Sequence, residues 1–228
     1  MDIARNCRYT ATMLEYPLVC FDLDGTLVDD TIYIWKTLHE MFDTDPEARR
    51  DAYHGYFSGR ISYREWFEHD IKLLKAAGAD RARIVEIIDS LRPMAGAHEL
   101  LFSLKDAGHK LAVISGSLDI VVSHLFDESL FDHVLVNRLH FNVDGEISGG
   151  DHTPYDLDGK AEGLRALAKI EGLSTSRTVF IGDNENDIWV AKAAGLSIAF
   201  NCKSDALREV CDVEIREKNL MALRPLIQ

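Results

Sequence analysis

Short apolar runs that alternate with helical segments are the feature that most constrains the fold of this chain. Six such runs lie at residues 18–21, 111–114, 134–136, 178–181, 197–200 and 213–215. Nearly continuous, β-branched runs are typical of parallel strands that are buried on both faces. The helical patterns at 97–108, 160–172 and 186–195 each end at a glycine, and an Asp-Gly pair within 142–146 predicts a hairpin turn. The alternation predicts an α/β fold with a doubly wound parallel sheet.

The alternation breaks between about residues 30 and 95, where the pattern is helical and no convincing strand occurs. Pro46 predicts the start of one helix, and Pro93 and Gly96 mark the return to the sheet. We therefore expect a core domain at 17–30 and 96–228, with a helical cap subdomain inserted at 31–95. Residues 1–16 form an N-terminal extension that is left unassigned. The aromatic residues of the insertion are expected to form mainly a small core of its own: Tyr33, Trp35, Tyr53, Tyr56, Phe57, Trp66 and Phe67.

The charge and cysteine content exclude several classes of protein. The 228 residues carry a formal net charge of -13, which argues against nucleic acid or an anionic membrane surface as the main partner. A small anionic substrate is compatible with this charge if its site is locally positive. No apolar run is long enough to span a bilayer, and the first 16 residues lack the apolar segment of a secretory signal. The four cysteines contain no CxxC pair, so we expect reduced thiols and a cytoplasmic location. The sequence gives no indication of the oligomeric state.

Two aspartates follow the first apolar run and define the first candidate site. Asp22 and Asp24 alternate along an extended chain, so their carboxylates point the same way. Two buried carboxylates repel each other unless a cation lies between them. Because Asp, Gly and Thr also favour turns, the segment 22–26 alone does not separate a turn from a site.

Further polar residues follow other predicted strands, where a doubly wound sheet binds its ligands. They stand at strand ends or at a helix start: Ser115, Gly116, Lys160, Asp183, Asn186 and Asp187. Taken singly, a serine and glycine before a helix commonly form a turn, and a lone lysine is usually a solvated surface charge. The loop 183–187 does not fit a calcium loop, because Ile188 stands where that loop needs glycine. The combined order and placement favour one site at the carboxyl edge of the sheet.

A phosphoryl-transfer site accounts for this combination of residues. Asp22 is expected to be the nucleophile that forms an aspartyl phosphate. Asp24 is expected to protonate the leaving alcohol and then to deprotonate the water that hydrolyses the intermediate. A Mg²⁺ ion bound by Asp22, Asp24 and Asp183, with a backbone carbonyl among its ligands, would keep the carboxylate and the phosphate from repelling each other.

The other polar residues are expected to hold the substrate. Lys160 supplies positive charge to the phosphoryl oxygens. Ser115 Oγ and the Gly116 N–H hold another oxygen at a helix N-terminus, and Asn186 is a further substrate-binding candidate. Asp187 is expected to orient Lys160 or a metal-bound water.

These motifs resemble those of the haloacid dehalogenase superfamily, in its phosphatase branch. The stretch DLDGT at 22–26 matches the first motif of that family, and ISGS at 114–117, Lys160 and GDNEND at 182–187 match the other three in order. Beyond the motifs, the chain is similar to the phosphoserine phosphatase subgroup over most of its length, for example in VLVNRLHFNVDGEISGG at 134–150. The resemblance implies a Mg²⁺-dependent phosphomonoesterase with a cap that closes over the substrate and excludes water. Residues 1–16 lie outside the resemblance.

Two positions depart from the pattern of phosphoserine-specific members. Those members carry a glutamate that binds the substrate ammonium, and this chain has Thr31 at that position. They also carry a cap arginine that pairs with the substrate carboxylate, and this chain has Asp70 there. Arg60 and Arg64 are nearby alternatives for the arginine. On the resemblance, exchanging Thr31 for Glu and Asp70 for Arg is expected to raise the turnover of O-phosphoserine.

The leading hypothesis is therefore a Mg²⁺-dependent hydrolase of a small phosphomonoester that acts through an aspartyl phosphate, with O-phosphoserine as the first candidate substrate. The alternatives are a phosphatase for another small phosphomonoester, a phosphotransferase or mutase that passes the phosphoryl group to an alcohol, and a non-catalytic regulatory domain that binds phosphate. Loss of Asp22 or Asp24 would favour the regulatory domain, and both residues are present.

Overall fold

A seven-stranded sheet forms the centre of the computed structural model, which describes residues 14–29 and 31–227. Its strands are β1 (Leu18–Phe21), β4 (Lys110–Leu118), β5 (His133–Phe141), β6 (Ile147–Asp151), β7 (Thr178–Gly182), β8 (Leu196–Phe200) and β9 (Val213–Ile215). Their order is β6-β5-β4-β1-β7-β8-β9, and every neighbouring pair is parallel except β5 and β6. Residues 1–13 of the expected N-terminal extension lie outside the described residues.

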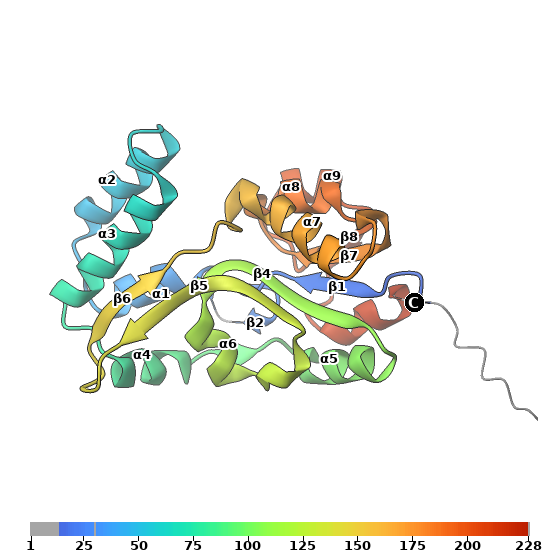
Figure 1. Cartoon of the computed structure of the whole chain (residues 1–228), viewed down its shortest axis with the longest axis horizontal. Coiled ribbons are helices and arrows are strands. Elements are labelled where there is room, and N and C mark those ends of the chain that lie inside the picture. Colours follow the sequence, from blue (N-terminus) through green and yellow to red (C-terminus); the bar gives the residue numbers. More distant parts are fainter. Residues whose placement is uncertain (1–13, 30, 228) are drawn as a thin grey trace, which may run out of the picture.

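Helices cover both faces of the sheet (Figure 1). One layer holds α4 (Arg81–Ile88), α5 (Ala97–Asp106) and α6 (Asp119–Leu125), and the other holds α7 (Lys160–Ile170), α8 (Ile188–Ala193) and α9 (Asp205–Val210). The described chain also contains short 3-10 turns: η1 (Glu128–Leu130), η2 (Leu157–Gly159), η3 (Thr175–Arg177), η4 (Glu185–Asp187) and η5 (Leu220–Leu226). None of the helices in the described ranges has both the length and the apolar character needed to cross a membrane.

The predicted fold class is confirmed, with one difference at the edge of the sheet. All six predicted runs lie within strands, but β6 was not predicted and runs antiparallel to β5. The predicted Asp-Gly turn explains this direction, because Asn142 N–H donates to Glu146 O at 2.9 Å and closes a hairpin. Gly145 there has φ 84°, which favours glycine.

The central strand β1 is buried on both faces. Val19 and Phe21 belong to one core cluster and Leu18 and Cys20 to another, and all four side chains have no exposed surface. Alternate residues of a strand point to opposite faces, so a continuous apolar run supplies both cores. Burial of each large apolar side chain contributes about 1.5–3 kcal/mol. The end of β1, where Asp22 follows, is therefore firmly anchored.

A two-stranded antiparallel ribbon, β2 (Val28–Asp29) with β3 (Arg92–Pro93), lies at the two ends of the segment that we expect to be an insertion. The first three helices of this segment are α1 (Ile34–Met41), α2 (Pro46–Phe57) and α3 (Tyr63–Ala76), and α2 and α3 form a hairpin that projects from the end of the sheet near β6 (Figure 1). Leu38, Leu74 and Ile84 of the insertion are fully buried in the larger core cluster of the sheet. The inserted helices are therefore anchored in the same apolar core as the strands.

The aromatic residues of the insertion do not form a separate buried core, contrary to expectation. They do contact one another: Tyr56 stacks on Trp66 at 5.1 Å between ring centroids, and Tyr53 lies 4.5 Å from Phe57. Of the seven, only Phe67 is buried. The rings line a pocket, whereas aliphatic residues of the same helices, such as Leu38 and Leu74, pack into the core.

Gly150 in β6 lies directly beneath α3. A Cβ at this position would come within 2.8 Å of Phe67 Cζ and 2.9 Å of Ile71 Cδ1, and it would overlap the carbonyl of Arg138. We therefore expect Gly150→Ala to lower the free energy of unfolding by about 1–3 kcal/mol. Gly149→Ala is the matched control, because a Cβ there meets nothing within 4 Å. Chemical denaturation checks both variants, and equal effects would contradict the packing of α3 on β6.

Candidate active site

The carboxyl ends of β1, β4 and β7 bring several predicted residues to one edge of the sheet. Asp22 follows β1, Ser115 and Gly116 lie near the end of β4, and Asp183 follows β7. β1 lies between the other two strands, and Asp22 N–H donates to Ile181 O of β7 at 2.9 Å. This bond fixes the backbone of Asp22 in the middle of the edge.

Lys160 is fully buried at the start of α7 and joins two of the predicted carboxylates. Its Nζ donates to Asp22 Oδ1 at 2.7 Å and to Asp187 Oδ1 at 2.6 Å. Burial by itself lowers the pKa of Lys160, but the charges of Asp187 and Asp22 outweigh it and raise the pKa above its ordinary value. The ammonium group is therefore held in its charged form beside Asp22.

Asp24 is oriented by two hydrogen bonds. Its Oδ2 accepts from the N–H of Ile34, the first residue of α1, at 2.7 Å, and its Oδ1 accepts from Ser117 Oγ at 2.9 Å. Burial raises the pKa of Asp24 to about 7, with a further rise from the charge of Asp22, although the two hydrogen bonds oppose the shift. A carboxyl group of this kind can both donate and accept a proton near neutral pH.

Three buried carboxylates form an acidic trio: oxygens of Asp22, Asp183 and Asp187 lie within 4.8 Å of one another. Burial raises the pKa of Asp183, and the charges of Asp22 and Asp187 add to the rise, whereas contact with Lys203 lowers it. Buried oxygen ligands at this spacing are what Mg²⁺ prefers, so the trio fits a divalent cation. The sequence predicted Asp24 as the third ligand, but the third carboxylate at this spacing is that of Asp187. The carboxylate of Asp24 instead accepts hydrogen bonds from Ile34 of α1 and Ser117 of β4.

The backbone at Gly116 is held by both the sheet and the insertion. Its carbonyl oxygen accepts from Trp35 Nε1 at 2.9 Å and from Asn137 Nδ2 at 2.7 Å. A Cβ at position 116 would overlap the carboxylate of Asp156, so glycine is needed for Asp156 to lie here. Tyr63 Oη donates to Asp156 Oδ2 at 2.9 Å and thereby links α3 to the loop before α7. The segment predicted to bind a phosphoryl oxygen is thus fixed from two sides.

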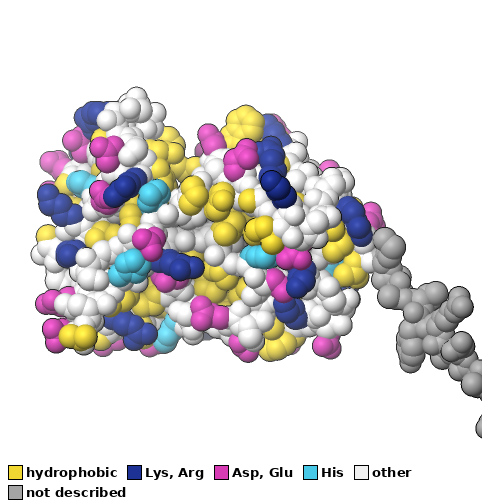
Figure 2. Space-filling model, viewed as in Figure 1, with side chains coloured by type: hydrophobic (Ala, Val, Ile, Leu, Met, Phe, Trp, Pro, Cys, Tyr) yellow, Lys and Arg dark blue, Asp and Glu magenta, His cyan; other side chains and the backbone are white. Residues whose placement is uncertain are grey.

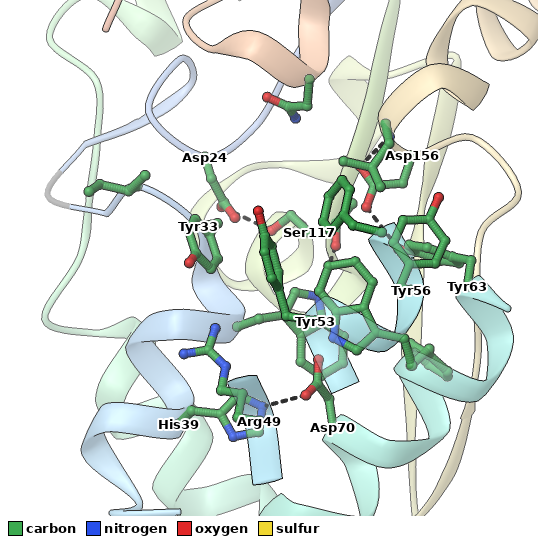
Figure 3. A pocket seen from close by; sticks show the side chains of 18 of the residues that line it. Asp24, Tyr33, His39, Arg49, Tyr53, Tyr56, Tyr63, Asp70, Ser117 and Asp156 are labelled. Atoms are coloured by element: carbon green, nitrogen blue, oxygen red, sulfur yellow. Dashed lines mark hydrogen bonds and ion pairs between the residues drawn. The ribbon is translucent and has the colours of Figure 1, made fainter. Parts of the chain in front are cut away.

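A pocket of about 1210 Å³ opens above this edge. Figure 2 shows it as a notch between the α2–α3 hairpin and the helices α7 and α8, and Figure 3 shows its lining. Of the predicted site residues, it is lined by Asp22, Asp24, Ser115, Gly116, Asp183 and Asn186. Its opposite wall is aromatic and consists of Tyr33, Trp35, Tyr53, Tyr56, Phe57, Tyr63, Trp66 and Phe67. The two remaining predicted residues, Lys160 and Asp187, have no exposed surface and lie beneath Asp22.

Three polar residues of the site were not anticipated from the sequence. Ser117 had a signal, because it alternates with Ser115 along β4 and therefore faces the same side. Asp156 and Tyr63 had none, because they are 93 residues apart and meet only through the packing of α3 against the core. Thr31, which departs from the family pattern, is not among the residues that line the pocket.

Comparison with known proteins identifies the family. A family model of haloacid dehalogenase-like hydrolases matches residues 16–195. The chain belongs to this family. The family model covers the inserted helices and all the predicted site residues, so the haloacid dehalogenase resemblance found in the motifs is confirmed.

Within the haloacid dehalogenase-like hydrolases, the chain is similar to curated phosphoserine phosphatases. It is 32% identical over 223 residues to the phosphoserine phosphatase of Archaeoglobus fulgidus, an alignment that covers 96% of this chain and 62% of that protein. It is 30% identical over 215 residues to the one of Methanocaldococcus jannaschii, with coverage of 92% and 97%. The chain thus spans less than two thirds of the first relative and nearly all of the second.

Solved structures of phosphoserine phosphatases share the fold of this haloacid dehalogenase-like hydrolase. A phospho-aspartyl intermediate analogue of a phosphoserine phosphatase superposes with a TM-score of 0.72 and 30% sequence identity, over 93% of this chain and 99% of that one. A substrate-bound phosphoserine phosphatase complex superposes with a TM-score of 0.73 and 29% identity over the same shares.

Proposed function

We propose that this haloacid dehalogenase-like hydrolase cleaves small phosphomonoesters through an aspartyl phosphate on Asp22, with O-phosphoserine as the first candidate substrate. The observation that carries the proposal is the contact of Asp22 Oδ1 with the buried Lys160 Nζ at 2.7 Å, in a pocket that Asp24 also lines. The relatives named as phosphoserine phosphatases support the same reaction and substrate class.

The first step is an attack of Asp22 on the phosphorus atom. Because Lys160 engages Oδ1, we assign Oδ2 as the attacking oxygen. A bond forms between Oδ2 and phosphorus, and the bond between phosphorus and the alcohol oxygen breaks. The charge of Lys160 offsets the repulsion between the carboxylate and the phosphoryl oxygens, and Asp187 holds Lys160 in this position. Ser115 Oγ, the Gly116 N–H and Asn186 bind the phosphoryl oxygens.

Asp24 moves the proton in both steps. Its carboxyl group gives a proton to the departing alcohol oxygen, and the resulting carboxylate then takes a proton from the water that attacks the aspartyl phosphate. The hydrogen bonds from Ile34 and Ser117 hold its oxygens for this role. The aromatic wall contributed by the proposed cap, residues 31–95, would exclude other water from the phosphoryl group.

A divalent cation belongs to the same proposal. Asp22 and Asp183 of the acidic trio would hold Mg²⁺ together with the backbone carbonyl of Asp24, while Asp187, whose Oδ1 accepts from Lys160, would orient that lysine. The ion would supply positive charge between the nucleophile and the phosphate.

Phosphate release from an aryl phosphate and from O-phosphoserine tests the proposal. With Mg²⁺, we expect turnover of both substrates, and with a chelator we expect the rate to fall by about 100-fold or more, because several kcal/mol of charge stabilisation are lost. Undiminished turnover in chelator would contradict the role of the cation. Loss of substrate that requires an added alcohol acceptor and yields a new phosphomonoester in place of inorganic phosphate would indicate a phosphotransferase. Absence of turnover on all phosphomonoesters would indicate a non-catalytic domain.

A further inference from the structure

The segment of β4 that is expected to bind a phosphoryl oxygen lies where the sheet is interrupted. β4 pairs with β5 at Ile114 and again at Leu118, but the register shifts between these two positions. Residues 115–117 of β4 therefore stand opposite the single residue Val136 of β5. On the other side of β4, the pairing with β1 ends at Val113. Irregularities of this kind often redirect backbone groups next to an active site.

Side chains bind both ends of the peptide that joins Gly116 to Ser117. Trp35 Nε1 donates to Gly116 O at 2.9 Å, and Asn137 Nδ2 donates to the same oxygen at 2.7 Å. At the other end of the peptide, Ser117 N–H donates to Ser115 Oγ at 3.2 Å. The carbonyl and the N–H of a trans peptide point in opposite directions. The Gly116 carbonyl oxygen is therefore turned away from Ser115 Oγ.

The direction of each of these hydrogen bonds follows from the chemistry of the partners. An indole nitrogen only donates, and a backbone carbonyl only accepts. The side-chain amide of Asn137 is oriented because its Oδ1 accepts from the Thr153 N–H at 2.8 Å, which leaves Nδ2 for Gly116 O. Asn137 has no exposed surface. The carbonyl oxygen of Gly116 is thus held by one donor from the sheet and by one from α1.

The indole of Trp35 is itself held in place. Its ring meets the ring of Phe67 in α3 edge to face, with 5.6 Å between the centroids and 82° between the planes. Phe67 is buried and packs over Gly150 of β6. Trp35 also follows Ile34, whose N–H donates to Asp24 at 2.7 Å. The first turn of α1 therefore places one donor on Asp24 and the next on the backbone of β4.

The orientation of this peptide prepares Ser115 to bind an anion. Ser115 is 3% exposed and lines the pocket together with Asp22 and Asp24. Its Oγ accepts from the Ser117 N–H, so its own proton remains for another acceptor, and none is found among the described residues. A peptide rotated the other way would present a carbonyl oxygen there, which repels an anion, and glycine at position 116 permits such a rotation. The two hydrogen bonds to Gly116 O oppose it.

We propose that Trp35 is a positioning residue for the phosphoryl group. Its indole N–H, together with Asn137, holds the peptide after Gly116 so that the hydroxyl of Ser115, rather than a carbonyl oxygen, meets the phosphoryl oxygens. Because Trp35 belongs to α1 of the proposed cap, the cap completes the phosphate subsite as well as covering it. This inference rests on the proposed phosphatase function and adds to it a residue that lies outside the four motifs.

Replacing Trp35 by phenylalanine tests the assignment, because it removes the indole N–H and keeps an aromatic ring. With the full chain and Mg²⁺, we expect kcat/KM to fall by about tenfold for O-phosphoserine and for an aryl phosphate alike, since both carry the same phosphoryl group. Calorimetry with inorganic phosphate should show a dissociation constant that rises by a similar factor. The thermal unfolding midpoint checks that the fold persists.

The two other tryptophans of the chain supply matched controls. Trp189→Phe makes the same exchange on α8, at a residue that is 53% exposed and does not line the pocket, and should keep the activity of the unaltered protein. Trp66→Phe makes it within the aromatic wall and should leave the affinity for phosphate unchanged. Asn137→Ala removes the second donor to Gly116 O and should repeat the losses of Trp35→Phe.

Unchanged phosphate affinity in Trp35→Phe, or an equal loss in Trp66→Phe, would overturn the assignment. A loss confined to O-phosphoserine would also overturn it, because Trp35 would then act on the leaving group. If Trp35→Phe does not fold, the phosphate affinity of Asn137→Ala decides. Failure of the unaltered protein on every phosphomonoester would refute the proposed function, and the binding of inorganic phosphate would still decide whether Trp35 positions the subsite.

Discussion

Replacing Asp22 by asparagine is expected to lower kcat for phosphate release by about four orders of magnitude or more. Asparagine has nearly the same shape, but its amide is a far weaker nucleophile than a carboxylate. The fold should persist, because Lys160 keeps an oxygen to which it can donate and because one of the three buried charges that repel each other is removed. Phosphate release at saturating O-phosphoserine and aryl phosphate, together with the thermal unfolding midpoint, measures both effects.

The control for this variant is Asp158→Asn, which alters an exposed acid of the same pocket that has no role in the proposed mechanism. It should keep the activity of the unaltered protein. Acid quench with a substrate labelled in its phosphoryl group adds a direct readout of the covalent step, because the unaltered protein should retain label and Asp22→Asn should not. Retained label or near-normal turnover in Asp22→Asn would show that another residue is the nucleophile.

The residues at the centre of the site could be predicted because each follows a strand, and the carboxyl ends of these parallel strands lie at one edge of the sheet. β1, β4 and β7 were recognisable as apolar runs, and the polar residues that follow such strands must meet at their carboxyl ends. Asp22, Ser115 and Asp183 were predicted together, because each segment taken singly also fits a turn. Lys160 is different, because a single lysine in a sequence is normally a surface charge, and only the agreement of the four motifs singled it out. The structure places it without exposed surface between two carboxylates.

The aromatic wall of the pocket could not be predicted by the same reasoning. Periodicity reports which face of a helix is apolar, but not which part of the molecule that face meets. The position of α3 depends on contacts between segments that are distant in the chain, such as Tyr63 with Asp156 and Phe67 with Gly150. The aromatic side chains were therefore expected in a local core, whereas the hairpin turns them toward the strand ends. The pairing of Asp70 with His39, 31 residues earlier in the sequence, was hidden for the same reason.

Replacing Asp24 by asparagine is expected to lower kcat/KM by about 10²- to 10⁴-fold for an alkyl phosphomonoester such as O-phosphoserine. The effect should depend on the leaving group, because an alkoxide must be protonated as it departs and a nitrophenolate need not be. With a nitrophenyl phosphate, the first step should proceed and the second should stall, since no carboxylate remains to deprotonate water. The expected result is a burst of nitrophenol equal to the enzyme concentration, followed by slow turnover.

The geometry around Asp24 supplies a variant that separates proton transfer from positioning. Ser117→Ala removes one of the two hydrogen bonds that hold the carboxyl group but leaves the acid in place. It should reduce turnover by about tenfold, in keeping with the loss of one hydrogen bond to a charged group, and should produce no burst. If Asp24→Asn reduced alkyl and aryl substrates equally and gave no burst, Asp24 would be a positioning residue. The proton for the leaving alcohol would then have to come from another group, and Asp156, a half-buried acid that lines the pocket beside Gly116, would be the one to replace next.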